Sequence, residues 1–232
     1  IFSYSCDPKY LKYVKLLKKK NPICLIDLKD DQSIYKLNAK LVKRYLKNKH
    51  QSFDPDFVFI KDIKKKINIK NYYPLNLVPI SKFEKIKPNK NLRYDFSFIG
   101  NYRKIHMRDR FEIINFLKKN YNNSYLNIYE QTQKLEITKE EQDKIFQQSK
   151  ILVSPSGIIW DSYRHLGLYK YKKPVLMPRP LIKITDPNFT DMKNCIMYDV
   201  SIKKGKTVLI NKKKLFEKLN YVLRNKNIQE RI

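Results

Sequence analysis

The residues with the clearest chemical potential lie in two short segments, each of which contains one of only four glycines in the chain. Residues 98–101 read FIGN, and residues 154–157 read SPSG directly after the apolar run ILV at 151–153. Glycine lets a ligand approach the backbone closely, and the backbone amides at the start of a helix attract anions. A short strand that ends in SPSG and is followed by a helix therefore indicates a site for an anion such as a phosphate.

Arginine supplies positive charge beside the second segment. Arg164 falls in the first turn of the helix expected after Gly157, where its guanidinium can donate to two phosphate oxygens while amides near Ser156 and Gly157 supply neutral donors. The alternative is a surface arginine that pairs with Asp161. Asp161 and Ser162 also suit the capping of this helix, and a capping residue can contact a ligand at the same time.

A second group of arginines follows the FIGN segment. Arg103, Arg108 and Arg110 are three of the nine arginines in the chain, and this concentration favours an anionic ligand. We expect one of the three to face the ligand and the others to pair with Asp109 or Glu112 on the surface of a helix.

The elements that must position these residues alternate, from residue 93 onward, between short apolar strands and helical patterns. This alternation is typical of a parallel sheet covered by helices, as in a Rossmann-like domain. Thr138 followed by Glu141 is a capping-box signature for the start of one helix. The expected strands are 94–99, 125–129, 151–153, 174–177 and 195–198, and the expected helices are 107–119, 138–148, 161–171 and 213–224.

The same alternation recurs before residue 93 in a shorter form. Strands are expected at 2–5, 23–27 and 57–60, and helices at 10–19 and about 34–46. Three prolines within 69–91 interrupt any helix or central strand, so this stretch is expected to connect two domains. The sequence therefore predicts an α/β fold with domains at 1–92 and 93–232. It opens at Ile1 as though inside a strand, which leads us to expect further residues upstream.

Several runs occur in the order found in one group of enzymes. They are YDFSFIGN (94–101), SPSG (154–157), WDSYR (160–164) and KPVL (173–176). Together they resemble glycosyltransferases of the GT-B architecture, in particular the exostosin-like and spore-maturation-protein-like branches. The resemblance covers residues 93–232 best, whereas CLIDLKDD at 24–31 and FIKD at 59–62 are shorter matches. It implies two Rossmann-like domains, with the N-terminal one short or incomplete and on the acceptor side.

The resemblance also implies a site in the C-terminal domain for a nucleotide-sugar donor, expected to be a UDP- or GDP-sugar, without a metal ion or other cofactor. Arg164 would stabilise the diphosphate as it leaves. An inverting reaction needs a base for the acceptor, and Asp30 and Asp31 are the candidates, with a solvated turn as the alternative. The residues expected to bind the nucleotide sugar are Gly100, Asn101, Arg103, Arg108, Arg110, Ser154, Ser156, Gly157, Asp161, Ser162 and Arg164.

Two positions depart from the pattern of these enzymes. The family usually has a glutamate for the nucleotide ribose three residues after the arginine, and this chain has Gly167 there. Lys172 stands where relatives often carry a glycine. A protein that kept the fold and lost turnover is therefore an alternative. His165, next to Arg164, is expected either to contact phosphate or to pack.

The composition adds a strong positive charge with two interpretations. Lys and Arg number 50 against 22 Asp and Glu, a formal net charge of +28 at pH 7, which favours nucleic acid or an anionic membrane surface as a partner. The excess is mostly lysine, spread among Ile, Asn and Tyr as an AT-rich genome would produce, which favours a solvated surface. The leading hypothesis is a glycosyltransferase with an unidentified glycan, lipid-linked or protein acceptor. A nucleic-acid-directed transferase and a binding protein with a basic surface are the alternatives.

Cysteine content and hydropathy bear on location. Cys6, Cys24 and Cys195 are an odd number without metal-ligand spacing, which fits a reducing compartment. No apolar run approaches the ~20 residues of a membrane-spanning helix. We expect a cytoplasmic protein that contacts a membrane, if at all, peripherally.

Overall fold

The computed structural model describes residues 24–27, 39–50, 55, 57–60, 68–74, 89, 91–102, 109–130, 137–157, 163–181, 189–203 and 206–232. Contacts between Cα atoms divide the chain into two units. The N-terminal unit comprises Ile1–Leu77 and Pro180–Pro187, and the C-terminal unit comprises Val78–Arg179 and Asn188–Ile232. The domain boundary expected between residues 92 and 93 stays a prediction. The strand expected at 2–5 and the helix expected at 10–19 lie outside the described residues.

The N-terminal unit contains a parallel three-stranded sheet with the order β1-β2-β3. Its elements are β1 (Cys24–Asp27), α3 (Ala39–His50), β2 (Phe57–Ile60) and β3 (Tyr72–Pro74). The sequence predicted β2 at its observed bounds, while α3 begins and ends a few residues later than expected.

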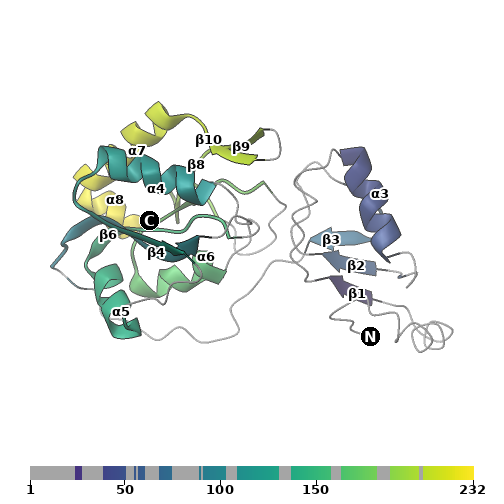
Figure 1. The fold of residues 1–232 in the computed structure, drawn as a ribbon, viewed down its shortest axis with the longest axis horizontal. Coiled ribbons are helices and arrows are strands. Elements are labelled where there is room, and N and C mark those ends of the chain that lie inside the picture. Colours follow the sequence, from purple (N-terminus) through teal and green to yellow (C-terminus); the bar gives the residue numbers. More distant parts are fainter. Residues whose placement is uncertain are drawn as a thin grey trace. The chain divides into compact units, whose positions relative to one another are not determined.

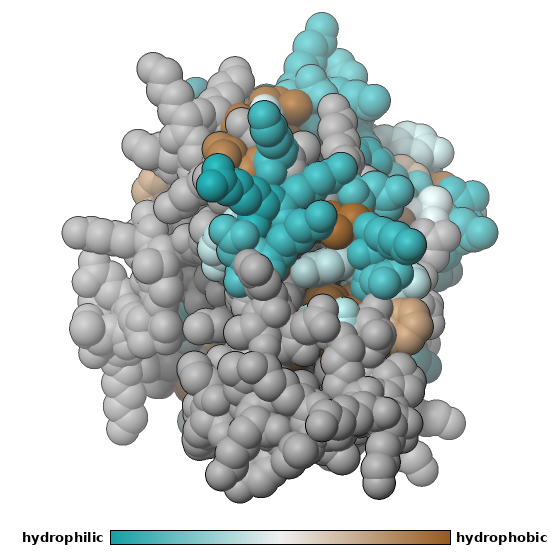
Figure 2. All heavy atoms as spheres, turned by 90° about the vertical axis from the view of Figure 1, so that its right-hand side faces the viewer, coloured by the Kyte–Doolittle hydropathy of each residue, from teal (hydrophilic) through white to brown (hydrophobic). Residues whose placement is uncertain are grey.

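Helix α3 is amphipathic. Val42 and Leu46 lie one turn apart, are fully buried, and pack with Leu25, Val58 and Ile60 in the core of this unit. The opposite side is basic and exposed, with Lys40, Lys43, Arg44 and Lys47. On the side of the molecule shown in Figure 2, most of the described residues are hydrophilic.

Strand β3 lies within the stretch 69–91, which was expected to connect two domains and in which no edge strand was foreseen. It pairs in parallel with β2 through Val58↔Tyr72, Phe59↔Tyr73 and Ile60↔Pro74. A strand tolerates Pro74 here because β3 lies at the edge of the described sheet and the proline is its last residue, where no ladder donor is needed. The Tyr73 ring adds a contact to Phe59, with ring centroids 5.5 Å apart.

The C-terminal unit is built on a five-stranded parallel sheet with the order β5-β4-β6-β7-β8. The strands are β4 (Tyr94–Tyr102), β5 (Ser124–Glu130), β6 (Ser149–Val153), β7 (Val175–Pro178) and β8 (Ile196–Tyr198). All five were expected from the sequence, and no observed bound differs from the expected one by more than three residues. The α/β fold class is therefore as the sequence predicted.

Helices cover both faces of this sheet (Figure 1). On one face α4 (Asp109–Asn120) and α7 (Lys212–Arg224) pack against Phe96, Phe98 and Ile151. On the other face α5 (Lys139–Gln147) and the 3₁₀ helix η3 (Leu168–Tyr171), which continues α6 (Tyr163–Gly167), pack against Ile99 and Leu152. Consecutive strand residues thus point to opposite faces, and both are apolar, as a doubly covered parallel sheet requires.

The predicted capping box at the start of α5 is confirmed. The Thr138 backbone N–H donates to Glu141 Oε2 at 2.8 Å, and the Glu141 N–H donates to Thr138 Oγ1 at 3.2 Å. These two bonds satisfy amides that have no partner inside the helix and set where α5 begins.

Other elements differ from the expectation. The single helix expected at 161–171 is the short α6 followed by η3, which ends at Lys172 with a left-handed φ of 53°. An antiparallel hairpin of β9 (Val200–Lys203) and β10 (Lys206–Leu209), and the final helix α8 (Lys226–Arg231), were not expected. Among the described residues, no helix is both long and apolar enough to cross a bilayer.

The strand order locates one special point in the sheet. Numbered within the C-terminal unit, the order is 2-1-3-4-5, so the chain changes the direction in which it adds strands between β4 and β6. In open α/β sheets ligands bind beyond the carboxyl ends of the strands at such a switch point. A ligand site is therefore expected at the residues that follow β4 and β6.

Candidate ligand site at the switch point of the sheet

The two glycine segments predicted to bind a ligand lie at this switch point. β4 pairs with β6 as far as Ser97↔Leu152, whereas its pairing with β5 continues to Tyr102↔Glu130. The ends of β4 and β6 therefore separate just before FIGN and SPSG. Because β4 and β6 separate there, side chains from α4 and α6 reach the ends of these two strands.

Arg164 reaches from the first turn of α6 to the end of β4. Its Nη1 donates to the Ile99 carbonyl oxygen at 2.7 Å, and its guanidinium carbon lies 4.9 Å from the centroid of the Phe98 ring. A Cβ atom at Gly100 would lie 2.9 Å from both Nη1 and Nη2 of Arg164 and 2.8 Å from Phe98 Cζ. Glycine at position 100 is therefore what lets Arg164 lie across the strand end.

Arg110 ties the two glycine segments to each other. Its Nε and Nη2 donate to the Ser156 carbonyl oxygen at 3.2 and 3.0 Å, and its Nη1 donates to the Asn101 carbonyl oxygen. Only 4% of Arg110 is exposed, so it lies in the interior and not on the helix surface. Of the three arginines expected after FIGN, Arg103 and Arg108 lie outside the described residues.

Asp109, which the sequence placed in a surface ion pair, is instead fully buried and accepts a hydrogen bond from Ser156. Asp109 Oδ2 accepts a hydrogen bond from the Ser156 N–H at 3.1 Å and one from the Tyr198 hydroxyl at 2.8 Å. Burial raises the pKa of Asp109, although these hydrogen bonds and the charge of Arg110 act in the opposite direction. The Ser156 amide, expected to serve a phosphate, thus already donates to Asp109.

Ser154 and His165 form a second buried pair. Ser154 Oγ and His165 Nδ1 lie 2.8 Å apart, and both residues are almost completely buried. The pair joins the end of β6 to α6 and so helps to fix the direction of Arg164. His165 is packed in the interior, which was one of its two expected roles. The Ser154 hydroxyl is hydrogen-bonded to it there.

The electrostatics of the site are set by two buried guanidiniums. Burial first, and the positive charge of Arg110 second, lower the pKa of Arg164 to about 10. Burial also lowers the pKa of Arg110, while the nearby Asp109 charge opposes this shift. Arginine side chains are not deprotonated in proteins, so both groups carry a positive charge at neutral pH. An anion placed beside them would offset their desolvation and their mutual repulsion.

The remaining predicted residues divide into two sets. Asn101 contributes its carbonyl to Arg110, and Gly157 is partly exposed at the end of SPSG. Asp30, Asp31, Arg103, Arg108, Asp161 and Ser162 lie outside the described residues, so their roles stay predictions. No cluster of three or more His, Cys, Asp or Glu that could hold a metal ion occurs in the part of the chain that the structure describes.

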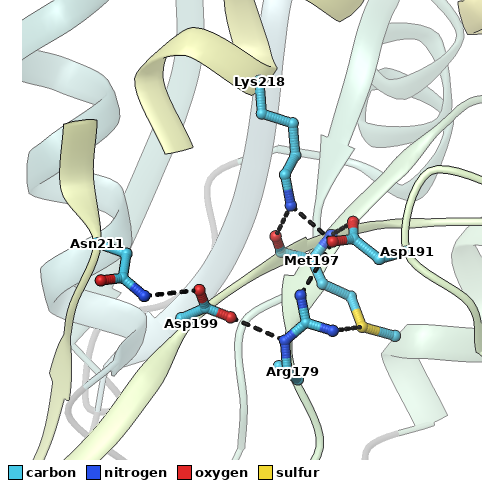
Figure 3. Close-up of polar contacts among 6 residues, drawn as sticks. All are labelled: Arg179, Asp191, Met197, Asp199, Asn211 and Lys218. Carbon is cyan, nitrogen blue, oxygen red and sulfur yellow. Dashed lines mark hydrogen bonds and ion pairs between the residues drawn. The ribbon is translucent and has the colours of Figure 1, made fainter. Parts of the chain in front are cut away.

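A separate polar cluster lies beyond the ends of β7 and β8 (Figure 3). Arg179 binds Asp199 at 2.8 Å and Asp191 at 3.0 Å, and Lys218 from α7 donates to Asp191 and to the Met197 carbonyl oxygen, each at 2.7 Å. Asn211 donates to the second oxygen of Asp199. We call these five residues with Met197 the β8 cluster, because they fasten α7 and the loop before it to β8.

Comparisons with known proteins place this fold. No protein-family model matches the chain, and no curated protein matches its sequence. The structure is similar to that of TarM, with a TM-score of 0.50 and 14% identity over 92% of this chain and 45% of the TarM chain. Another solved structure, TarM of S. aureus with fondaparinux, α-GlcNAc-glycerol and UDP, gives a TM-score of 0.49 and 13% identity over 94% of this chain and 52% of that one. The lipopolysaccharide outer core galactosyltransferase WaaB gives a TM-score of 0.49 and 10% identity, over 93% of this chain and 70% of the WaaB chain.

The chain shares the α/β fold of TarM, which is the GT-B type expected from the sequence. It spans about half of the TarM chain in the two structures. The exostosin-like branch finds no support among these structures.

Proposed function

We propose that this chain is a glycosyltransferase that moves a sugar from a nucleotide-sugar donor to an acceptor. The observation that carries the proposal is the meeting of two buried guanidiniums, Arg110 and Arg164, at the switch point of a doubly covered parallel sheet. A diphosphate is the anion that this position accepts in folds of this type.

The chemistry of glycosyl transfer fits these groups. The bond between the anomeric carbon and the diphosphate oxygen breaks, and the diphosphate keeps the electron pair. The acceptor oxygen forms the new bond to carbon and loses its proton to a base. Arg164 and Arg110 stabilise the negative charge that develops on the diphosphate, which is the largest electrostatic demand of the step. Asp30 and Asp31 remain the candidates for the base in an inverting reaction.

Fold similarity supports the proposal and directs the choice of ligands. The fold is that of TarM, and one solved structure of TarM contains UDP. The resemblance seen in the sequence implies a UDP- or GDP-sugar and a branch related to exostosins. UDP and GDP therefore head the list of donors to test, with a glycan or a lipid-linked glycan as the acceptor.

Calorimetry tests the proposal directly. The ligands are UDP, GDP, ADP, CMP and their sugars. They are titrated into the full chain, into Arg164→Ala and into Arg164→Lys. Arg224→Ala, at an exposed arginine of α7, is the matched control. We expect one nucleotide to bind and Arg164→Ala to weaken it by about 10- to 100-fold, since a hydrogen bond to a charged group contributes about 1.5–3 kcal/mol. Arg164→Lys keeps the charge and should lose less.

Two results would contradict the proposal. One is that no nucleotide or nucleotide sugar binds to the full chain. The other is that Arg164→Ala and Arg164→Lys, both folded by circular dichroism, bind the nucleotide as tightly as Arg224→Ala does.

A further inference from the structure

A pocket of about 250 Å³ lies in the C-terminal unit between α5 and the α6–η3 segment. Its lining includes the cations Lys139, Arg164 and Lys170, the carboxylate of Asp143, and the backbone of Gly167. Arg164 thus belongs both to this pocket and to the arginine pair at the end of β4. The pocket and the proposed phosphate site are therefore contiguous through one side chain.

Gly167 has no structural reason to be glycine in the described part of the chain. Its φ of −60° and ψ of −26° are ordinary helical angles, which any residue adopts. A Cβ atom built there meets nothing within 4 Å. Glycine inside a helix costs about 0.5–1 kcal/mol of stability relative to alanine. At position 167 the missing side chain leaves open space and permits no close contact. That space is part of the pocket.

Asp143 presents a carboxylate of fixed orientation to this space. It accepts a hydrogen bond from the Tyr171 hydroxyl and one from Lys170 Nζ at 3.3 Å, and both donors come from η3. Two carboxylate oxygens offer about four acceptor positions. A carboxylate held in this way can accept further hydrogen bonds from a pair of neighbouring hydroxyl groups.

The size of the pocket limits what it holds. Sites that enclose a whole drug-sized ligand measure about 300–1,000 Å³, so this pocket suits one ring system with its substituents and not an entire nucleotide sugar. The ligand must carry hydroxyl groups for Asp143 and an anionic group on the side of Arg164.

We propose that this pocket binds the ribose of the donor nucleotide, with Asp143 of α5 as the residue that accepts its hydroxyl groups and Gly167 as the residue that leaves room for the ring. This rests on the proposed function, because it assigns one part of the same donor. It places the hydroxyl-binding carboxylate on α5, a helix that the sequence had not connected with the site.

The test compares the nucleoside diphosphate that the full chain binds most tightly with its 2′,3′-dideoxy form. Calorimetry is carried out on the wild-type chain, on Asp143→Asn, and on Glu140→Gln as a matched control at an exposed carboxylate of the same helix. We expect the wild-type chain and Glu140→Gln to prefer the ribonucleotide by about tenfold or more, the size of at least one hydrogen bond to a charged group. Asp143→Asn should reduce that preference to less than about threefold.

A second pair of variants tests the space at position 167. Gly167→Leu should fill the pocket and weaken the ribonucleotide by tenfold or more, whereas inorganic pyrophosphate, which needs only the arginines, should bind as before. Gly167→Ala adds one carbon and should change little. Both should unfold at or above the wild-type temperature, so loss of binding is not loss of fold.

The outcomes separate this inference from the proposed function. If the wild-type chain binds a nucleotide, but Asp143→Asn keeps the full preference for the ribonucleotide or Gly167→Leu binds it normally, the ribose assignment is wrong and the transferase proposal stands. If the wild-type chain binds no nucleotide, both are wrong.

Discussion

Gly100 and Gly167 show how the same residue type serves two different purposes. Gly100 removes a side chain that would collide with Arg164 and Phe98, whereas Gly167 removes one that would meet nothing. The first glycine permits an internal contact, and the second leaves space for something from outside. From the sequence alone, Gly100 was a ligand-binding residue and Gly167 a missing carboxylate.

The two glycines should respond in opposite ways to the same substitution. Gly100→Ala should destabilise the protein by about 1–3 kcal/mol, the usual penalty for an extra carbon in a packed interior. Gly167→Ala should stabilise it by about 0.5–1 kcal/mol. Urea unfolding of both variants measures this difference. Equal stability of the two would show that Arg164 does not lie where the structure places it.

Some residues of the site could be predicted, and others could not, for a physical reason. Glycine and arginine are scarce in this lysine-rich chain, so Gly100 and Arg164 stood out, and Ser156 was singled out as the neighbour of Gly157. Asp109 was assigned to a surface ion pair because nothing local shows that it is buried. Its contacts to Ser156 and Tyr198 span 47 and 89 residues. Such contacts follow from the way the sheet assembles and leave no periodic signal.

At the scale of elements, strands with strong apolar patterns and helices with marked starts were predictable. β2 and the capping box of α5 are examples. β3 was missed because its three residues end in proline, and the β9–β10 hairpin because VSIK and KTVL carry weak patterns. Short edge strands are stabilised by their neighbours more than by their own sequence.

The β8 cluster predicts how the stability of the C-terminal unit depends on pH. Burial raises the pKa of Asp191, but hydrogen bonds from Lys218 and the Met197 N–H outweigh this effect, so its pKa lies below the ordinary 3.8. Burial also raises the pKa of Asp199, but the hydrogen bond from Arg179 and other contacts outweigh it, so this pKa is lowered too. A lowered folded-state pKa means that the unfolded chain binds more protons, so this stability is present above pH 3.8 and is lost as pH falls below it.

Thermal unfolding between pH 3 and pH 6 tests this expectation. Asp191→Asn should unfold at a lower temperature than the wild-type chain at pH 6, and the difference should shrink toward pH 3. Glu217→Gln, at an exposed carboxylate of α7, is the control and should follow the wild-type curve. A constant difference at every pH would mean that the charge of Asp191 contributes nothing.

At the scale of the whole molecule, the net charge of +28 has two interpretations, a polyanionic partner or a solvated surface. The exposed lysines of α3 agree with either interpretation. A donor held by two arginines involves few phosphate contacts, whereas a protein that covers many phosphates releases many counterions when it binds.

Salt dependence separates these cases. Between 50 and 200 mM salt, nucleotide affinity should fall by less than about tenfold, while binding to duplex DNA through several contacts would fall by about 10³–10⁵. Calorimetry and filter binding at matched salt concentrations measure both. If duplex DNA binds tightly at 200 mM salt and the nucleotide does not bind, nucleic acid is the partner.

The position of β4 in the sheet also means that this strand is synthesised before both of its partner strands. β4 is central, yet both of its neighbours, β5 and β6, come after it in the chain. A ribosome that has just completed β4 must add about 50 more residues before β6 can pair with it, which takes roughly 3–10 s at common rates of synthesis. During that interval Phe96 and Phe98 have no finished core to enter. The nascent chain therefore exposes the apolar residues of β4 before either partner strand has been made, and we expect its yield in cells to depend on chaperones that bind at this stage.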